Sequence, residues 1–252
     1  WVDFEKEISR VIQTIDFAVK SEKVPIDKNT GKFGSKLEAY VFEVISPFFE
    51  EDAATAGIKK IGELKNRLLC DLNRLTRLLE LYLAYYIEEE CNPDPLPIIM
   101  SLKIDRVLSF NYTSTFEKLY GQGSDDIKYD YIHGKAKKGF NVNTCNLVLG
   151  IDEYLTDTDR DNDNGYIEFK KFYQRIYKRT GCEYKNWLGH YNESVHRTPK
   201  ANHDVIQIYF YGHSLDVTDK DIIAELIRQK NAKTTVFYHS RNALAQQISN
   251  LV

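Results

Sequence analysis

The sequence predicts an α/β fold with a mainly parallel sheet and a helical region packed at its N-terminal side. Helical spacing of apolar residues changes at a proline-rich stretch, 92–97, to short apolar runs that alternate with helical segments. These runs are rich in Val, Ile, Phe and Tyr, as buried parallel strands are. Polar clusters directly follow three of them. Ligands gather beyond the carboxyl ends of parallel strands, so we expect one pocket to collect the three clusters.

Apolar residues at helical spacing predict three helices in the first third of the chain. The first runs to about Lys20, a second apolar stripe spans 37–48, and a third helix covers about 61–90. The polar stretch at 21–35 carries Pro and Gly and is typical of a loop. We therefore expect a helical region over 1–91, packed on an α/β core over 98–252.

Alternating strand and helix patterns fill the core region. The predicted strands cover 106–110, 129–132, 146–149, 205–211 and 234–238. The predicted helices cover 114–120, 166–178, 219–230 and 241–251. Such alternation is typical of parallel sheets, because parallel strands need crossover connections.

The composition is that of a globular protein without a bias towards polyanionic partners. Of the 252 residues, 42% are hydrophobic and 28% are charged, with a net charge of -3. This balance does not favour general nucleic-acid binding or an acidic membrane surface. No apolar run reaches the roughly 18 to 20 residues that span a bilayer. The cysteines lack paired metal spacing and favour reduced thiols, so we expect a cytoplasmic protein: Cys70, Cys91, Cys145 and Cys182.

An acidic run resembles a calcium loop in part. Asp157, Asp159, Asp161 and Glu168 fall at positions 1, 3, 5 and 12 of such a loop. Asn162 stands where a glycine makes the sharp turn, and no helix clearly enters the loop. A solvated acidic loop is the favoured interpretation, and we predict no metal.

Asn111 follows the first predicted strand of the core. Its amide offers both a donor and an acceptor, which suits ribose hydroxyls. Thr113 or Ser114 can cap the next helix, whose free N–H groups favour phosphate. A purely structural role for Asn111 in the turn is equally open.

Histidines mark the other two strand ends. His133 can titrate near neutrality and act as a general base, although lone histidines are more often structural. Gly134 lets the backbone turn away without a side chain. The third cluster supplies close backbone approach, polar groups and a helix cap: Gly212, His213, Ser214 and Asp219.

Four motifs resemble the phage abortive-infection AbiH family: SFNYTSTFEKLYG, YIHG, LGIDEYL and IYFYGHSLDVTDKDII. The resemblance covers roughly 1–239 and implies a role in antiviral defence. That family usually starts with a strand and a Gly-rich NGFD turn. The chain instead begins inside helical spacing at Trp1, so we expect that first strand to lie upstream.

More distantly, the three strand-end clusters resemble sirtuin-like domains, which bind NAD in a Rossmann-type fold. Thr113 stands where sirtuins carry an acid, and His213 replaces their Thr. The four zinc cysteines of sirtuins have no equivalent, so the resemblance implies NAD cleavage rather than deacetylation. The counterparts of cofactor-contacting residues are Asn111, His133, Gly134, Gly212, Ser214 and Leu215.

Together these observations predict an antiviral effector with a Rossmann-like core that cleaves its substrate NAD at the nicotinamide–ribose bond. We expect Asn111 to orient the ribose and His133 to act as the base. The expected nucleotide contacts are Thr113, Gly134, Gly212, His213, Ser214 and Asp219. A phage trigger, a partner protein and a homo-oligomer stay open.

Two other functions stay open. A noncatalytic nucleotide-sensing module would keep the pocket and act through a partner. A metal-dependent nuclease-type toxin would need clustered carboxylates, for which the candidates are Asp152, Glu153, Asp216 and Asp219.

Overall fold

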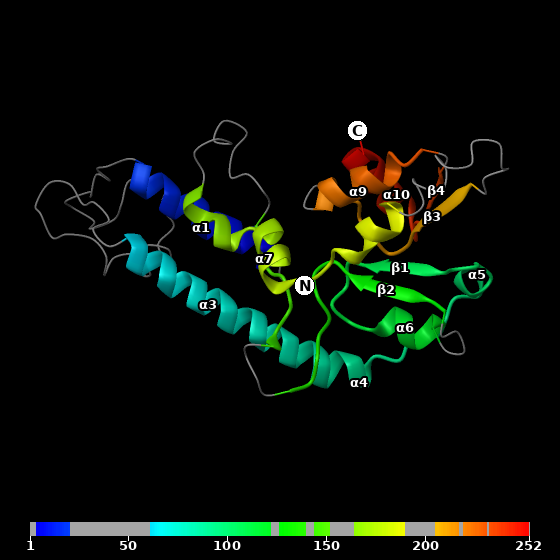
Figure 1. Cartoon of the computed structure of the whole chain (residues 1–252), viewed down its shortest axis with the longest axis horizontal. Coiled ribbons are helices and arrows are strands. Elements are labelled where there is room, and N and C mark those ends of the chain that lie inside the picture. Colours follow the sequence, from blue (N-terminus) through cyan, green and yellow to red (C-terminus); the bar gives the residue numbers. More distant parts are fainter. Residues whose placement is uncertain are drawn as a thin grey trace, which may run out of the picture. The chain divides into compact units, whose positions relative to one another are not determined.

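The computed structural model describes residues 4–20, 61–121, 126–139, 144–151, 164–189, 205–216, 219–230 and 232–251 (Figure 1). It divides into two compact units, Trp1–Cys182 and Glu183–Val252. Each unit contains a two-stranded parallel sheet and helices, so the fold is mixed α/β. The finer prediction of a Rossmann-like sheet stays a prediction. The loop at 21–35, the stripe at 37–48 and the acidic run at 157–163 lie outside the described residues.

Two of the predicted helices form and share one hydrophobic core. They are α1 (Phe4–Lys20) and the long helix α3 (Ile61–Tyr82) (Figure 1). The apolar stripe of each helix turns inward, as helical periodicity requires. The core joins both helices to segments beyond the prolines, and its buried members are Ile12, Ile15, Leu64, Leu72, Leu149, Ile151, Tyr166 and Phe169.

The helix predicted over 61–90 is confirmed as a continuous rod with a change of pitch. Helix α3 runs into the π-helical turn η2 (Leu83–Ile87) and then into α4 (Glu88–Glu90). Cys91 leaves the rod with an extended backbone (ψ 101°). Prolines cannot continue a helix, and Pro97 instead occupies the start of α5 (Pro97–Met100).

The sheet of the first unit consists of two parallel strands. They are β1 (Arg106–Ser109) and β2 (Lys128–Tyr131), with α6 (Thr115–Tyr120) between them in sequence. The register pairs Arg106 with Lys128 and Ser109 with Tyr131. Both strands and the helix form within one or two residues of their predicted bounds.

The strand predicted over 146–149 is wrong, because its backbone groups find other partners. The N–H of Val148 donates to the carbonyl of His133 (2.8 Å). The side-chain amide of Gln174 bonds both the N–H and the carbonyl of Leu149, at 3.2 and 2.9 Å. A side chain thus satisfies groups that a neighbouring strand would otherwise pair.

The helix predicted over 166–178 forms in two pieces. They are the 3-10 segment η4 (Asn164–Phe169) and α7 (Lys171–Lys178), separated at Lys170, whose backbone is extended. Lys170 makes a single parallel bridge with Ile151. The buried ammonium of Lys171 pairs with Glu5 at 2.8 Å and so joins α7 to α1.

The second unit holds β3 (Ile206–Phe210), α9 (Lys220–Ile227), β4 (Ala232–Val236) and α10 (Arg241–Leu251). The parallel register pairs Ile206 with Ala232 and Phe210 with Val236. Strand β4 begins two residues before its predicted start, and a helix over 183–189 was not predicted. Within the described ranges, no helix combines the length and apolar character needed to cross a membrane.

Candidate functional site

Asn111 and His133 come to the same edge of the β1–β2 pair. The register aligns Ser109 with Tyr131, and each candidate residue lies two positions beyond this last pair. The N–H of Ile132 still donates to the carbonyl of Ser109 (2.9 Å), which extends the parallel ladder by one bond. The two polar groups therefore share the carboxyl edge of the pair, the position where parallel sheets bind ligands.

The turn that carries Asn111 is held by another side chain. The hydroxyl of Ser109 donates to the carbonyl of Asn111 and accepts from its N–H, both at 3.2 Å. Asn111 itself is exposed. Ser109 thus satisfies the backbone of the turn, while the Asn111 side chain stays exposed.

His133 is enclosed, with only 4% of its surface exposed. The ring of Phe110 lies edge-on at 6.0 Å from the imidazole, and the ring of Tyr112 lies at 6.1 Å. The hydroxyl of Tyr112 is anchored on the carbonyl of Val148 (2.8 Å). The imidazole of His133 is therefore buried and packs beside two aromatic rings.

A positive φ and close packing against a neighbouring backbone segment require glycine at position 134. Its φ is 82°, and a Cβ atom there would lie 2.2 Å from the carbonyl oxygen of Asn146. Only glycine accommodates both the positive φ and this close approach. Of the remaining predicted contacts in this unit, Thr113 places its hydroxyl 3.0 Å from that of Thr115.

The start of α6 is already held by a carboxylate. Ser114 occupies the N-cap position without a side-chain cap bond, which corrects the predicted capping role. Its hydroxyl donates instead to both oxygens of Glu88 (2.9 and 2.7 Å), and its N–H also donates to Glu88. This N–H is therefore not available to a phosphate.

Glu117 forms a second centre of charge beside this contact. Lys135 donates to its carboxylate at 2.6 Å, and the hydroxyl of Tyr131 donates to the same oxygen at 3.0 Å. The ammonium of Lys135 also lies 5.0 Å from the centre of the Tyr131 ring. Together these groups form the carboxyl-edge network: Glu88, Ser114, Glu117, Lys118, Tyr131 and Lys135.

The carboxylates of this network stay ionised well into the acid range. Burial alone would raise the pKa of Glu88, but hydrogen bonds from Lys118 and Ser114 outweigh it and lower the pKa below 4.5. Burial also opposes ionisation of Glu117, whose pKa is nonetheless lowered by Lys135 and Tyr131. At neutral pH both groups are fixed acceptors and poor general acids.

Sequence analysis missed this network. Glu117 and Lys118 lie inside the SFNYTSTFEKLYG motif, and Lys135 directly follows YIHG. Charged residues at these positions are the signal that could have indicated them. Glu88 carries no such signal, since it lies on a different element, 26 residues from Ser114.

In the second unit, the GHS turn after β3 is shaped by His213. The Nδ1 atom of His213 accepts from the N–H of Leu215 (2.8 Å), which has a positive φ of 57°. The ring proton therefore sits on Nε2, which lies 3.6 Å from Asp219 Oδ2. Asp219 makes no side-chain cap bond to α9, so its predicted capping role is wrong.

Helix α10 holds the same turn through two amides. Gln247 donates to the carbonyls of His213 (2.8 Å) and Phe237 (3.3 Å). Asn250 donates to the carbonyl of Ser214 at 2.9 Å. Gly212, with φ 67°, has no atom within 4 Å of the place a Cβ would occupy, and Ser214 is exposed. The turn is thus fixed from one side while Gly212 and Ser214 keep open surroundings.

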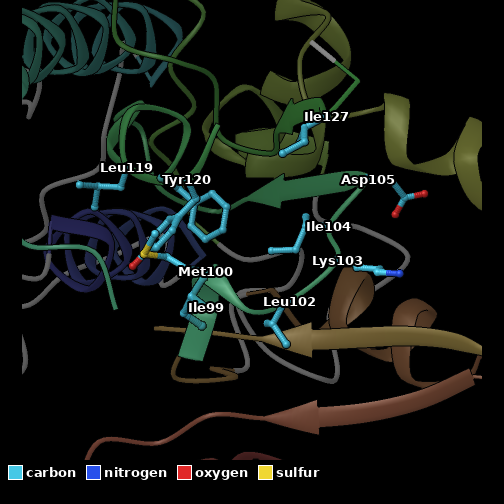
Figure 2. Close-up of a pocket in the computed structure, with 10 residues that line it drawn as sticks. Ile99, Met100, Leu102, Lys103, Ile104, Asp105, Leu119, Tyr120 and Ile127 are labelled. Carbon is cyan, nitrogen blue, oxygen red and sulfur yellow. The ribbon is translucent and has the colours of Figure 1, made fainter. Parts of the chain in front are cut away.

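A cavity of about 520 Å³ lies at the opposite end of β1 (Figure 2). Asp105 and Ile127, which line it, directly precede β1 and β2, so it opens at the amino edge of the pair. Its lining is mainly apolar: Ile99, Met100, Leu102, Lys103, Ile104, Asp105, Phe116, Leu119, Tyr120 and Ile127. Asn111 and His133 are not among its lining residues, and the sequence patterns did not indicate it.

Metal ligands do not cluster in the described part of the chain. Among its residues, no group of three or more His, Cys, Asp or Glu side chains could hold an ion. Asp152 and Glu153, candidates for a nuclease centre, lie outside the described residues, as does the acidic run at 157–163.

Comparison with known proteins identifies the family. The family model for bacteriophage abortive infection AbiH matches residues 1–239. No curated protein and no solved structure matched the chain significantly. The distant resemblance to sirtuin-like domains therefore stays a prediction. The match spans nearly the whole chain and includes Asn111, His133 and the GHS turn, so the chain belongs to the bacteriophage abortive infection AbiH family.

Proposed function

We propose that this chain acts in phage defence by hydrolysing NAD at the bond between nicotinamide and ribose. Membership of an abortive-infection family supports the role in defence. The observation that carries the chemistry is the common offset of Asn111 and His133 beyond the β1–β2 register. This offset supports a shared ligand site, because parallel sheets bind ligands beyond the carboxyl ends of their strands.

The proposed reaction passes through an oxocarbenium-like state at the ribose, as glycoside hydrolysis does. The exposed amide of Asn111 binds a ribose hydroxyl and orients the sugar. The imidazole of His133 takes a proton from the attacking water. The new C–O bond replaces the C–N bond, and nicotinamide leaves as the neutral base.

In the proposal, two aromatic rings that pack beside His133 control the access of water to its imidazole. Because Phe110 and Tyr112 pack beside the buried imidazole, we expect substrate binding to move one of these rings and admit water. Within the second unit, Gly212 and Ser214 are proposed as nucleotide contacts of their own, since both have open surroundings. The other proposed contacts are Thr113 and Gly134 in the first unit, and His213 and Asp219 in the second.

The test is incubation of the protein with NAD and a phage trigger, followed by mass analysis of nicotinamide and ADP-ribose. Asn111→Ala and His133→Gln are expected to reduce the rate by at least ~100-fold, the lower range for a positioned base. Asn73→Ala and His239→Gln are matched controls, because both residues are exposed and outside the site. Circular dichroism checks that each variant folds.

Three results would speak against the proposal. Full activity of both site variants refutes the assignment of Asn111 and His133. Unchanged NAD together with magnesium-dependent loss of nucleic acid favours the nuclease-type alternative. A nucleotide that binds and stays intact favours the sensing module.

A further inference from the structure

We propose that the rod formed by α3, η2 and α4 is a two-fold interface with a second copy of this chain. Three large apolar side chains stand exposed along the rod at intervals of four residues. Leu78 is 64% exposed, Tyr82 is 47% exposed and Tyr86 is 63% exposed. We call these three residues the exposed stripe. Contiguous exposed apolar residues on a helix are typical of surfaces that bind another protein.

The π-helical turn keeps the stripe on one face. In a regular α-helix, each step of four residues turns the side chain by about 40°, so a stripe of this spacing drifts around the axis. Residues 83–87 form η2, which has more residues per turn and reverses that drift between Tyr82 and Tyr86. The rings of Tyr82 and Tyr86 stack with centres 5.9 Å apart, which shows that they share a face.

A positive charge lies beyond one end of the exposed stripe, and a negative charge lies beyond the other end. Arg74 lies four residues before Leu78; its side chain is 79% exposed, and one of its guanidinium nitrogens lies 3.1 Å from Asp71 on the same helix. Glu90 lies four residues after Tyr86 and is also exposed. From Arg74 to Glu90 the rod extends about 24 Å at 1.5 Å per residue.

This order of residues is complementary to itself in an antiparallel pair. A two-fold axis at Tyr82 places Leu78 of one copy opposite Tyr86 of the other, and Tyr82 opposite its own equivalent. The same axis places Arg74 opposite Glu90 at both ends. The pattern therefore selects a second copy of this chain as the partner. The inference is independent of the proposed NAD chemistry, because no candidate site residue belongs to the stripe.

The proposed two-fold axis predicts which introduced cysteine forms a disulfide between two copies of the chain. Tyr82→Cys should form an intermolecular disulfide under mild oxidation, since residue 82 meets its own equivalent. Ile176→Cys is the control, because Ile176 is 58% exposed on α7 and lies outside the stripe. Wild-type protein corrects for the exposed native thiols of Cys70, Cys91 and Cys182.

Charge reversal tests the register without a cysteine. Arg74→Glu and Glu90→Arg should each weaken dimerisation about 10-fold, because each change converts two attractive pairs into repulsive ones. The double variant restores both pairs and should return the dimer to wild-type strength. Sedimentation velocity of the full chain over a concentration series measures the four dissociation constants, those of wild type and of the three variants. A wild-type protein that stays monomeric over a 100-fold increase in its concentration overturns the inference. So does a dimer whose strength is unchanged by Tyr82→Glu.

Discussion

The carboxylate of Glu88, at the end of the helical rod, accepts hydrogen bonds from both the hydroxyl and the N–H of Ser114. The contact joins two segments separated by 26 residues. It also holds the chain three residues beyond Asn111. The geometry of the candidate site in the first unit therefore depends on the last turn of a helix that carries none of the motifs.

Replacing Glu88 by Gln should destabilise the first unit. The variant keeps the size of the side chain but loses the carboxylate charge. That carboxylate accepts the hydrogen bond from Ser114 and forms an ion pair with Lys118. Loss of such charge-assisted bonds costs about 1–3 kcal/mol of unfolding free energy, measured by urea denaturation at pH 7. Glu7→Gln is the control, since its exposed pair with Arg10 should be worth less than about 1 kcal/mol. Equal losses in the two variants would contradict the role of Glu88.

The lowered pKa values of Glu88 and Glu117 give stability a defined acid dependence. Each carboxyl has a folded pKa below its ordinary 4.5, so it contributes stability above that value. The contribution is lost as pH falls through the folded pKa values, because protonation removes the acceptors. Denaturation series between pH 7 and pH 3 should show a shallower decline for Glu88→Gln than for wild type. An unchanged pH profile would show that Glu88 is not the titrating group.

A pair of glycine substitutions separates backbone strain from simple loss of flexibility. Gly134→Ala should destabilise the protein by more than about 2 kcal/mol, because the new Cβ meets the carbonyl of Asn146 at a positive φ. Gly62→Ala should stabilise it by about 0.5–1 kcal/mol, since Gly62 lies in α3 and nothing is within 4 Å of the new Cβ. Thermal denaturation of both variants tests the opposite signs.

The amides of α10 should control the mobility of the GHS turn. Gln247→Ala removes the bonds to the carbonyls of His213 and Phe237, so hydrogen exchange over residues 212–216 should accelerate. Asn250→Ala should have a smaller effect, because it removes one bond to Ser214. Asn242→Ala, an exposed change on the same helix, should leave the exchange rates unchanged. The experiment needs no nucleotide and is independent of the proposed activity.

Cys145 should be the least reactive cysteine. Burial and a hydrogen bond to Glu80 raise its pKa to about 11, so little thiolate forms at pH 8. Cys70 and Cys91 are exposed and should react faster with iodoacetamide. Peptide mapping by mass spectrometry over a time course ranks the rates. Labelling of Cys145 at the rate of the exposed thiols would contradict the raised pKa.

Within the described residues, local periodicity was sufficient to predict most helices and the four strands. Helix α1 and the rod over 61–90 follow from apolar spacing, and Pro97 marks the change to α/β alternation. The segment at 146–149 has the same apolar character as a strand, yet it pairs with no strand. Its partner is the side chain of Gln174, and no pattern within four residues can reveal a contact between residues 25 apart.

By itself, the sequence determined the family motifs, the strand ends and the order of Asn111 and His133 along the chain. Tertiary structure alone decided that they share an edge, because strand register depends on pairing between β1 and β2. It also decided that Phe110 and Tyr112 pack beside His133, and that Glu88 accepts a bond from the backbone at the start of α6. These contacts depend on how distant segments pack, and packing of that kind leaves no periodic mark in a sequence.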